Sequence, residues 1–401
     1  MLNVAIVGTG NISAAHIAAY LQFPEICKIV ALHDIIPERA WEKKEKFDLD
    51  AEVLTYEELL ARDDIDLVSN CTPPSEHAYL TIDLVRSGKN VVVEKPMAPS
   101  LKDCDAMNAA ARESGKMLSV IAQNRFRSDL DVVKASIDSE LLGPISHVQV
   151  DSAWWRGLPY YDLMWRGTWA SEGGGPTLNH AIHHIDLLLW MLGAPQSVTA
   201  AMVNAWHTNS EVEDLSVALL QYPHTIATIT ASVVHHGEEQ AFIVQGRDAS
   251  VAQPWAVKAN RSQNNGFPYP EPNQELVDRI GALKMAHPAL RHEGHVGQLL
   301  DVMNCIIGHR APAITGEDGR LTVEIVTAIY EAAIERRTVD LPIPVDSPWY
   351  SGAALLERAP RFHEKTGAVT DIGTGTYTYG GSPAPAVEAH ETASHIQDSG
   401  D

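Results

Sequence analysis

Cysteine is scarce in this chain of 401 residues, and no two cysteines lie close together in the sequence. Disulfide-dependent folds are small and rich in cysteine, and cysteine-based zinc sites need closely spaced pairs, so neither class fits this pattern. We expect buried free thiols at the four positions, which are Cys27, Cys71, Cys104 and Cys305.

Long apolar runs are also absent. The longest, within DLLLWMLG at 186–193, is far shorter than the roughly 20 residues that a membrane-spanning helix needs. The chain starts MLNVAIVGTG, with no basic leader and no cleavage site before the first strand pattern. These features predict a cytoplasmic protein without a membrane partner.

Basic residues are in the minority, with 30 Lys and Arg against 52 Asp and Glu, for a formal net charge of −22. A nucleic-acid partner requires a basic face, so this balance weighs against one. It does not exclude an anionic cofactor, which backbone N–H groups can hold. Apolar residues make up 45% of the chain, enough for a substantial core in two or three domains.

Residues 1–122 alternate apolar strand patterns with helix patterns. Strands that read as nearly continuous apolar runs are buried on both faces, so this half predicts a doubly wound α/β domain with a parallel sheet. Thr55 and Glu58 form a capping-box pattern at the start of one short helix.

The pattern changes after residue 122. Helix patterns near 129–141 and 176–193 are followed by a succession of β-rich runs. Strands grouped in this way favour an α+β domain, at 123–345, with an antiparallel sheet and helices on one face. Residues 346–401 form a C-terminal extension, whose last part is rich in Gly, Ser, Thr, Ala and Pro and is expected to be a poorly ordered tail.

The first strand pattern leads into GTGNISAAH. Gly8 and Gly10 fill the first two positions of a G-x-G-x-x-G fingerprint, where one glycine allows the tight turn and the next lets the backbone approach a pyrophosphate. Ser13 stands in place of the third glycine and would crowd the helix–strand contact. The turn, with Asn11 and Ile12, opens a helix whose N–H groups can face the cofactor.

A carboxylate ends the second strand pattern. Asp34 can accept hydrogen bonds from the adenosine ribose hydroxyls and would repel a 2′-phosphate. Residues 35–37 offer no cation or hydroxyl to such a phosphate, and Arg39 is expected on a solvated helix. The sequence therefore favours NAD over NADP, with the alternative that Asp34 only caps a turn or helix.

The segment NVVVEKP at 90–96 ends a buried strand pattern on two charged residues. Ligands of open α/β sheets bind beyond the carboxyl ends of the strands, which places Glu94 and Lys95 at that edge together with the turn at 72–74. Pro96 favours extended backbone at Lys95 and so directs its side chain. An ammonium there can polarise a hydroxyl or carbonyl oxygen, although an ordinary surface ion pair is the alternative.

A second polar cluster lies in EGGGPTLNHAIHHID. Residues 173–175 predict an adaptable glycine loop, followed by a helix on which Asn179, His183 and Asp186 share one face. His183 is therefore a candidate general base that Asn179 could orient, with a hydrogen-bonded core histidine as the alternative.

Two further pairs of histidines have metal-like spacing. His180 and His184 lie one turn apart on a neighbouring helix face, but no third ligand at suitable spacing is evident. His292 and His295, in RHEGH, are expected at the start of a helix. We therefore expect no metal site.

Four motifs in a fixed order resemble the glucose–fructose oxidoreductase/inositol dehydrogenase/MocA (Gfo/Idh/MocA) family. They are GTGNIS with the following histidine, TPPSEH at 72–77, EKP at 94–96 and GGGPTLNHAIHHID at 173–186. The resemblance covers roughly residues 1–345. It implies a Rossmann domain, then an α/β domain with a large open antiparallel sheet, and a homodimer or homotetramer.

The resemblance also implies roles for individual residues. In such enzymes the Lys of E-K-P and the His of the last motif flank the nicotinamide and the reacting carbon; these are Lys95 and His183 here. The bond before the proline of that motif is often cis in the family. Many members carry Asp where this chain has Asn179, which can orient an imidazole but cannot stabilise its charged form.

The segment WWRGLPYYDLMWRGTW, 154–169, is dense in aromatic residues for a chain with only 6% of them. Aromatic faces with Arg and Asp at their edges suit a polyol ring, so Arg156 and Trp165 are candidate substrate contacts. Arg166 is expected at the junction of cofactor and substrate, and Arg125, at the domain crossover, near it. The alternative is a contact between domains or between copies of the chain.

Together these features predict an NAD-dependent oxidoreductase that acts on a secondary hydroxyl of a sugar, anhydrosugar or cyclitol, or on the matching ketone. The alternatives are a non-catalytic NAD-sensing regulator and a glycoside hydrolase that uses transient NAD oxidation. The expected catalytic residues are Lys95, His183 and Asn179. The expected cofactor contacts are Gly8, Gly10, Asn11, Ile12, Asp34, Thr72, Pro73, His77, Glu94, Lys95, Asn124 and Arg166. The expected substrate contacts are Lys95, Arg125, Arg156, Trp165, Asn179 and His183.

Overall fold

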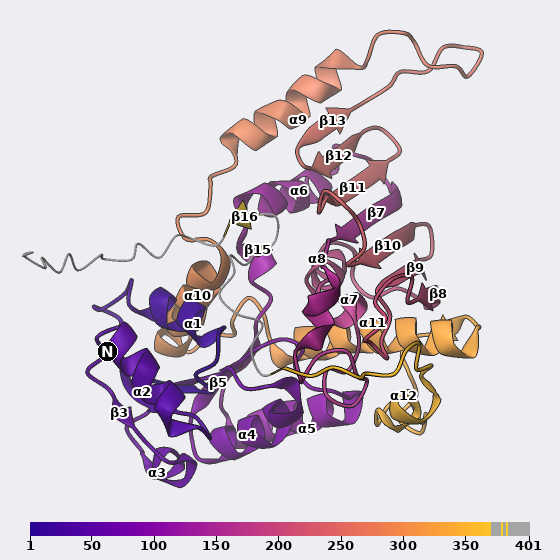
Figure 1. Ribbon diagram of the computed structural model, residues 1–401. Coiled ribbons are helices and arrows are strands. Elements are labelled where there is room, and N and C mark those ends of the chain that lie inside the picture. The colour runs from indigo at the N-terminus through magenta and orange to yellow at the C-terminus, as the bar shows by residue number, and fades with distance from the viewer. Residues whose placement is uncertain (370–377, 380–381, 384–401) are drawn as a thin grey trace, which may run out of the picture.

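The computed structural model describes residues 1–369, 378–379 and 382–383. Two sheets of different kinds organise these residues, one in each half of the chain (Figure 1). Among the helices described, none combines the length and apolar character required to cross a lipid bilayer.

The first sheet is parallel, with its six described strands in the order β3-β2-β1-β4-β5-β6. This is the order of a doubly wound dinucleotide-binding sheet, as the alternating pattern of the first 122 residues predicts. The strands are β1 (Leu2–Val7), β2 (Cys27–His33), β3 (Glu52–Val53), β4 (Leu67–Asn70), β5 (Asn90–Val93) and β6 (Leu118–Val120).

Helices connect these strands and bury the sheet, so that Val91, Val92 and Val93 of β5 have no exposed surface. The predicted capping box is confirmed, because Thr55 and Glu58 each accept a hydrogen bond from the other's backbone N–H. The helices are α1 (Ser13–Tyr20), α2 (Pro37–Lys46), α3 (Tyr56–Ala61), α4 (Pro74–Arg86) and α5 (Leu101–Ser114).

The second sheet has the order β13-β12-β11-β7-β10-β9-β8-β14 within the described residues. Its neighbouring strands are antiparallel except for β7 and β10, which run parallel, so the predicted antiparallel sheet is confirmed with one exception. The strands are β7 (Ile145–Ala153), β8 (Ser197–Val203), β9 (Leu215–Gln221), β10 (Ile226–Ser232), β11 (Gln240–Gly246), β12 (Ser250–Gln253), β13 (Ala256–Lys258) and β14 (Val339–Asp340).

Helices lie on one side of this sheet, where Figure 1 shows α7, α8 and α11. The opposite side is open, and Val217, Leu219 and Ile226 expose 47%, 39% and 43% of their surface there. The remaining helical elements of this half are the 3₁₀ turns η1 (Gln123–Phe126) and η2 (Leu158–Asp162), with α6 (Ser128–Asp138), α7 (Pro176–Asn179), α8 (Ile182–Leu192), α9 (Gln274–Ala286), α11 (Gly316–Glu335) and α12 (Ala353–Arg358).

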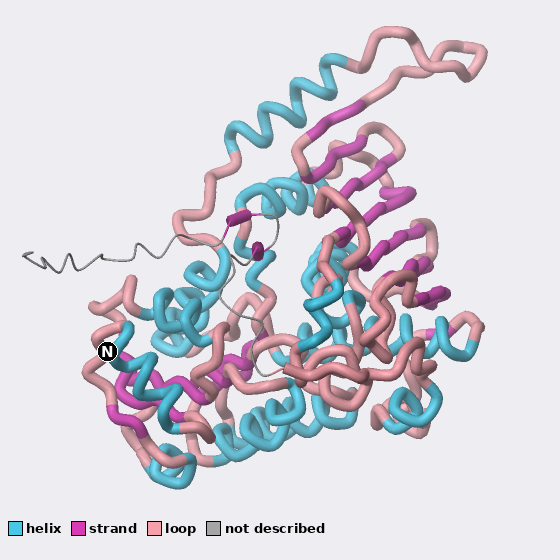
Figure 2. The backbone as a smooth tube through the Cα atoms, viewed as in Figure 1, coloured by secondary structure: helices cyan, strands magenta, loops and turns pink. Residues whose placement is uncertain are grey.

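One helix from late in the chain returns to the first sheet. Helix α10 (Gly294–Gly308) lies beside α1 in both ribbon and tube views (Figures 1 and 2). Leu299, Val302 and Met303 of α10 pack in one buried apolar cluster with Ile17 of α1. The dinucleotide-type half therefore contains a segment that lies far beyond residue 122.

The start of the C-terminal extension is packed against the second half. Trp349 is 2% exposed, and Trp169 donates a hydrogen bond from its indole Nε1 to the Pro360 oxygen (2.8 Å). The described part ends in two short strands, β15 (Thr378–Tyr379) and β16 (Ser382–Pro383). Most of the predicted low-complexity tail lies outside the described residues.

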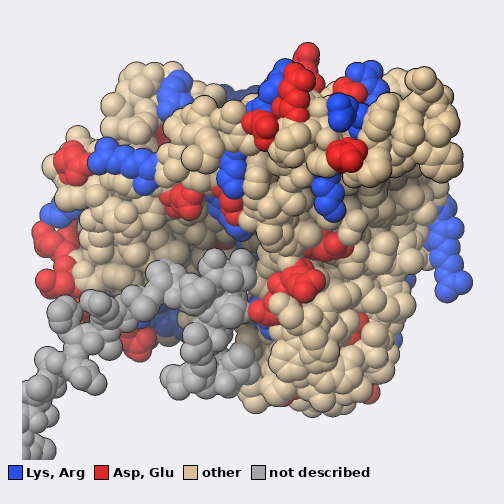
Figure 3. All heavy atoms as spheres, turned by 90° about the horizontal axis from the view of Figure 1, so that it is seen from above, with Lys and Arg blue, Asp and Glu red and all other residues tan. Residues whose placement is uncertain are grey.

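All four cysteines fall in the described part and are buried and free, as the sequence predicts. On the face seen from above in Figure 3, acidic and basic side chains lie interspersed.

Candidate functional site

The turn after β1 leaves space next to the start of α1. Gly8 has a φ of +85°, and a Cβ there would lie 2.8 Å from the backbone of Cys71 and Thr72, so the site accepts only glycine. At Gly10, in contrast, a Cβ would meet nothing within 4 Å. Protein packing does not explain that glycine, and the open space fits the close approach of a dinucleotide pyrophosphate. Ser13, in place of the third glycine, donates a hydrogen bond to the Gly10 oxygen (2.7 Å).

Asp34 follows β2 and is bound to this turn. One carboxylate oxygen accepts hydrogen bonds from the Thr9 N–H (2.8 Å) and the Thr9 hydroxyl (3.0 Å). The other accepts one from the Ile36 N–H (2.9 Å), so Asp34 also caps its own turn. The half-buried carboxylate thus lies beside the glycine turn, where a ribose-binding acid is expected.

The loops after β4 and β5 are joined by His77. This ring is fully buried, and its two nitrogens lie 2.9 Å from the Pro96 oxygen and 2.8 Å from the Thr72 oxygen. His77 therefore fixes the two strand exits and is not open to a ligand. The other expected cofactor contacts line the surface of these loops, with Asn11 and Pro73 exposed and Ile12, Thr72 and Asn124 half-buried.

Glu94 is buried and contacts two histidines. Its Oε1 lies 3.0 Å from His16 Nε2 and 3.5 Å from His295 Nε2, and its Oε2 accepts a hydrogen bond from the Lys95 N–H. Burial opposes its charge, but the hydrogen bond with His16 and the nearby His295 ring hold the pKa of Glu94 well below its ordinary value. The cluster joins α1, β5 and α10, and the spacing of its ligand atoms would also admit a metal ion.

Lys95 leaves β5 toward the second half of the chain. Its Nζ donates a hydrogen bond to the backbone oxygen of Asn179 (3.3 Å), and its peptide bond to Pro96 is cis, as the family resemblance implies. Burial lowers the pKa of Lys95, Arg166 lowers it further, and Glu94 and Glu172 oppose the change.

The predicted long helix is interrupted between Asn179 and Ile182, so Asn179 and His183 do not share one continuous helix face. The N–H groups of His180 and Ala181 both bond to the Pro176 oxygen, at 3.0 and 2.8 Å, which tightens the turn. The pattern of apolar residues continues through this turn, and sequence periodicity therefore does not reveal the break.

The side chain of Asn179 points to a carboxylate and not to the His183 ring. Its amide donates hydrogen bonds to Glu172 Oε1 (2.9 Å) and to the Gly174 oxygen (2.9 Å). The structure therefore gives no hydrogen bond between the Asn179 side chain and the His183 ring that would support the predicted orienting role. Glu172, which sequence reasoning missed, supplies a carboxylate next to Asn179.

The glycine run at 173–175 is tightly packed, which corrects the expectation of an adaptable loop. A Cβ at Gly174 would lie 2.0 Å from the Tyr330 hydroxyl, and one at Gly175 would lie 1.9 Å from the Glu213 backbone oxygen. The buried Glu213 carboxylate accepts hydrogen bonds from the N–H groups of Gly175 (3.1 Å) and Thr177 (3.2 Å) and from the Tyr330 hydroxyl (3.0 Å). Burial raises the pKa of Glu213 to about 7.

Lys95 and His183 line one small cavity of about 20 Å³, between β5 and the start of α8. Both side chains are half-buried, so a ligand can approach them. Burial and the neighbouring Lys95 charge lower the pKa of His183 well below its ordinary value. At neutral pH the imidazole is therefore uncharged and able to accept a proton.

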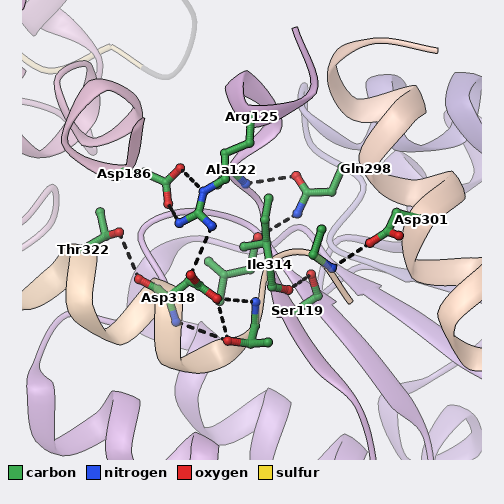
Figure 4. A network of polar contacts seen from close by, with 12 residues as sticks. Ser119, Ala122, Arg125, Asp186, Gln298, Asp301, Ile314, Asp318 and Thr322 are labelled. Atoms are coloured by element: carbon green, nitrogen blue, oxygen red, sulfur yellow. Dashed lines mark hydrogen bonds and ion pairs between the residues drawn. The ribbon is translucent and has the colours of Figure 1, made fainter. Parts of the chain in front are cut away.

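Arg125 is paired with two carboxylates, and its predicted contact with the substrate stays a prediction. Its Nε and Nη2 donate to Asp186 (2.8 and 2.7 Å), and its Nη1 donates to Asp318 (3.1 Å), within the network shown in Figure 4. Arg125 is 9% exposed. This buried network connects η1 with α8 and α11 and positions the helix that carries His183.

The aromatic segment covers the site from the second half. The Arg166 guanidinium lies 4.1 Å from the Trp165 ring centroid and 4.2 Å from that of Tyr160, and its Nη1 donates to Glu172 (2.8 Å). Trp165 is 47% exposed. The same Glu172 oxygen accepts a hydrogen bond from Asn179 (2.9 Å), whose backbone oxygen binds Lys95 Nζ (3.3 Å), so this segment lies close to Lys95.

Two family profiles match the chain. One, described as an oxidoreductase family with an NAD-binding Rossmann fold, matches residues 2–122, and the other, the GFO/IDH/MocA C-terminal domain, matches residues 131–252. The protein belongs to the Gfo/Idh/MocA family.

Named relatives in this family act on sugars and cyclitols. The scyllo-inositol 2-dehydrogenase (NADP(+)) of Bacillus subtilis is 29% identical over 323 residues, which cover 77% of this chain and 87% of the relative. The WlbA dehydrogenase of Bordetella pertussis, solved with NADH and UDP-GlcNAcA, is 28% identical with a TM-score of 0.73, covering 86% of this chain and 98% of the relative. The aldose–aldose oxidoreductase of Caulobacter crescentus is 27% identical with a TM-score of 0.69, over 85% of this chain and 99% of the relative.

In this Gfo/Idh/MocA protein His180, to which sequence reasoning assigned no role, is a further candidate for the site. Its ring lies 5.3 Å from Trp154, and its Nδ1 is buried with no hydrogen-bond partner among the described residues. Burial, then the charges of Arg156 and Arg166, lower its pKa well below the ordinary value. His184 is buried beside Arg127, and its pKa is lowered to about 4. Among the described residues, His180 and His184 do not belong to a group of ligand atoms that could hold a metal ion together.

Proposed function

We propose that the protein is an NAD-dependent oxidoreductase that oxidises a secondary hydroxyl of a sugar, anhydrosugar or cyclitol, or reduces the matching ketone. The observation that carries the proposal is that Lys95 and His183 line one cavity at the carboxyl edge of the parallel sheet. Ligands of such sheets bind at that edge, beside the glycine turn. The relatives that act on inositol and aldoses support the substrate class.

In this proposal His183 and Lys95 have different roles. The uncharged His183 imidazole takes the proton of the substrate hydroxyl, because its lowered pKa leaves the ring free to accept one. The Lys95 ammonium donates a hydrogen bond to the same oxygen as it becomes a carbonyl. A bound nicotinamide would supply the acceptor for the hydride that leaves the carbon. Proton transfer of this kind contributes about 10²–10⁴-fold to the rate.

The residues after β2 favour NAD over NADP. Asp34 places a carboxylate against the glycine turn, and Ile35 and Ile36 are exposed apolar residues that offer nothing to a 2′-phosphate. Because the B. subtilis relative is named for NADP(+), this preference is proposed from the residues of this chain. Fluorescence titrations with NADH and NADPH test it, and tighter binding of NADPH would contradict it.

The activity test follows NADH absorbance on mixing the protein and NAD with inositols, aldoses, anhydrosugars and glycosides. Lys95→Ala and His183→Ala should each abolish a signal that Lys102→Ala, an exposed lysine on α5, leaves intact. NAD binding without any turnover would favour the sensing regulator. Release of free sugar from a glycoside without net NADH would favour the redox-cycling hydrolase.

We also propose that the open face of the second sheet forms a contact between copies of the chain. Val217, Leu219 and Ile226 are exposed on neighbouring strands of that face. Exposed apolar clusters of this kind mark interaction surfaces. A homodimer or homotetramer built on this sheet would cover them.

A further inference from the structure

Three side chains of the kind that bind metal ions meet near the start of α10. They are His16 of α1, Glu94 directly after β5, and His295 of α10, and their ligand atoms lie within 4.8 Å of one another. We propose that these three residues bind one Zn²⁺ ion or a similar divalent transition metal, which joins α10 to the dinucleotide-type half. The inference does not depend on the proposed function, because the site requires no turnover.

The distances between the ligand atoms fit coordination. Glu94 Oε1 lies 3.0 Å from His16 Nε2 and 3.5 Å from His295 Nε2. Tetrahedral zinc with bonds of about 2.0–2.2 Å separates neighbouring ligand atoms by about 3.4 Å, so the two distances lie on either side of this value. The two imidazole rings are tilted by 56°, with centroids 5.5 Å apart, so they converge on the carboxylate instead of stacking on each other.

One ligand atom has no other use for its lone pair or proton. The Nε2 of His295 is buried, yet it makes no hydrogen bond within the described residues. Its position relative to Glu94 Oε1 is not that of a hydrogen bond, although the two atoms are only 3.5 Å apart. Buried polar atoms normally have a partner, and an ion is one explanation for an exception. A metal ion between the three ligand atoms would be bound by this nitrogen.

The other two ligands are held in position from behind. His16 Nδ1 lies 3.0 Å from the Ser69 hydroxyl, which can accept its proton and so leave the Nε2 lone pair free for a metal. Glu94 Oε2 accepts a hydrogen bond from the Lys95 N–H (3.1 Å), which leaves Oε1 facing the two imidazoles. Outer contacts of this kind fix the tautomer and orientation of metal ligands.

The ligand types select the class of metal. Two imidazoles and one carboxylate suit zinc and related transition metals, whereas Mg²⁺ and Ca²⁺ prefer oxygen ligands alone. The side chains of His16 and Glu94 are 0% and 6% exposed, but that of His295 is 19% exposed, so an ion would enter past His295. The sequence predicted no metal site, because these ligands come from three separate elements and no local spacing connects them.

The test uses the full chain, stripped of metal with a chelator, loaded with Zn²⁺ and then desalted. Elemental analysis should find about one Zn²⁺ retained per chain in the wild type and none in His295→Ala, because structural sites of this kind bind tightly. His292→Ala is the matched control and should retain the ion. His292 is also half-buried and close to the start of α10, but its ring packs edge-on against Phe23.

Two further measurements separate a metal site from a hydrogen-bonded cluster. Excess Zn²⁺ should raise the unfolding temperature of the wild type by at least about 2 °C and leave that of His295→Ala unchanged. Ser69→Ala keeps all three ligands but loses the contact behind His16, so it should weaken Zn²⁺ binding by about 10–100-fold in calorimetric titration.

Other results overturn the inference. A wild type that retains no Zn²⁺, or a His295→Ala variant that retains as much as the wild type, shows that the three residues are only hydrogen-bonded neighbours. If His295→Ala does not fold, Ser69→Ala decides, and an unchanged Zn²⁺ affinity in that variant overturns the site. Every measurement is made without substrate, so failure of the proposed oxidoreductase activity leaves this test unaffected.

Discussion

The ammonium nitrogen of Lys95 lies 3.3 Å from the backbone oxygen of Asn179. Lys95 directly follows β5 of the parallel sheet, and Asn179 ends α7 below the second sheet. This contact connects the two halves of the chain at the point where the glycine turn, the candidate base and the aromatic segment meet. The candidate reaction site is therefore shared between the halves.

The pH dependence of kcat/KM should reflect the two lowered pKa values of the cavity. His183 acts as a base only when uncharged, and its pKa lies well below 6.5, so activity should persist as the pH falls through 6.5. Lys95 acts as a donor only when protonated, and its pKa is lowered from 10.5. Activity should therefore fall at a lower alkaline pH than it would with an ordinary lysine. A pH–rate profile checks both limits. An acidic limb centred near 6.5 would contradict the assignment of His183.

The two glycines of the first turn should respond differently to replacement by alanine. Gly8→Ala should lower the free energy of unfolding by more than about 1 kcal/mol, because the new Cβ meets backbone at 2.8 Å and φ is positive. Gly10→Ala should leave stability unchanged and weaken NADH binding by about tenfold or more, since only the cofactor would meet that Cβ. Thermal unfolding and fluorescence titration measure the two effects. Wild-type affinity in Gly10→Ala would exclude this turn as the pyrophosphate site.

Arg125 should be essential to stability and not to substrate recognition. Arg125→Met leaves the Asp186 carboxylate buried without its partner, which should cost about 3–5 kcal/mol in urea unfolding. Arg112→Met is the control, because the Arg112–Glu317 pair is exposed and should contribute little. If Arg125→Met instead folded normally with a raised KM, Arg125 would be a substrate contact.

Glu213 should make the fold less stable as the pH rises toward neutrality. Its pKa is raised from 4.5 to about 7, so between these values the folded state binds more protons than the unfolded state. The free energy of unfolding therefore falls as pH rises through this window, by up to about 3 kcal/mol from this group. Urea unfolding of the wild type and Glu213→Gln between pH 4.5 and 7.5 checks this. If the free energy of unfolding changed with pH by the same amount in the two proteins, Glu213 would be ionised throughout this range.

Leu219→Glu should dissociate an assembly formed through the open face of the second sheet. A carboxylate at this exposed apolar position cannot be buried without a large cost, so the oligomer should separate into monomers that remain folded. Size-exclusion chromatography with light scattering measures the mass. The control is Ile307→Glu, an exposed apolar residue of α10 away from the sheet, which should keep the wild-type mass. An unchanged mass in Leu219→Glu would place the contact elsewhere.

Local sequence patterns determined the parallel sheet, the glycine turn and the placement of Lys95 at a strand exit. Each depends on residues that are neighbours along the chain. Alternation of strand and helix patterns predicts the doubly wound sheet, and the motif order predicts which strand end carries Lys95. The capping box at Thr55 and Glu58 was readable for the same reason, since both partners lie within one helical turn.

The tertiary structure alone decided which polar groups are available to a ligand. Arg125 is held by Asp186 and Asp318, which lie 61 and 193 residues away, and no periodic pattern encodes such pairings. Likewise the Glu213 carboxylate accepts a hydrogen bond from the Tyr330 hydroxyl, 117 residues away. A polar residue binds a ligand only when folding leaves its hydrogen-bonding groups unpaired, and that balance is set by contacts between distant parts of the chain.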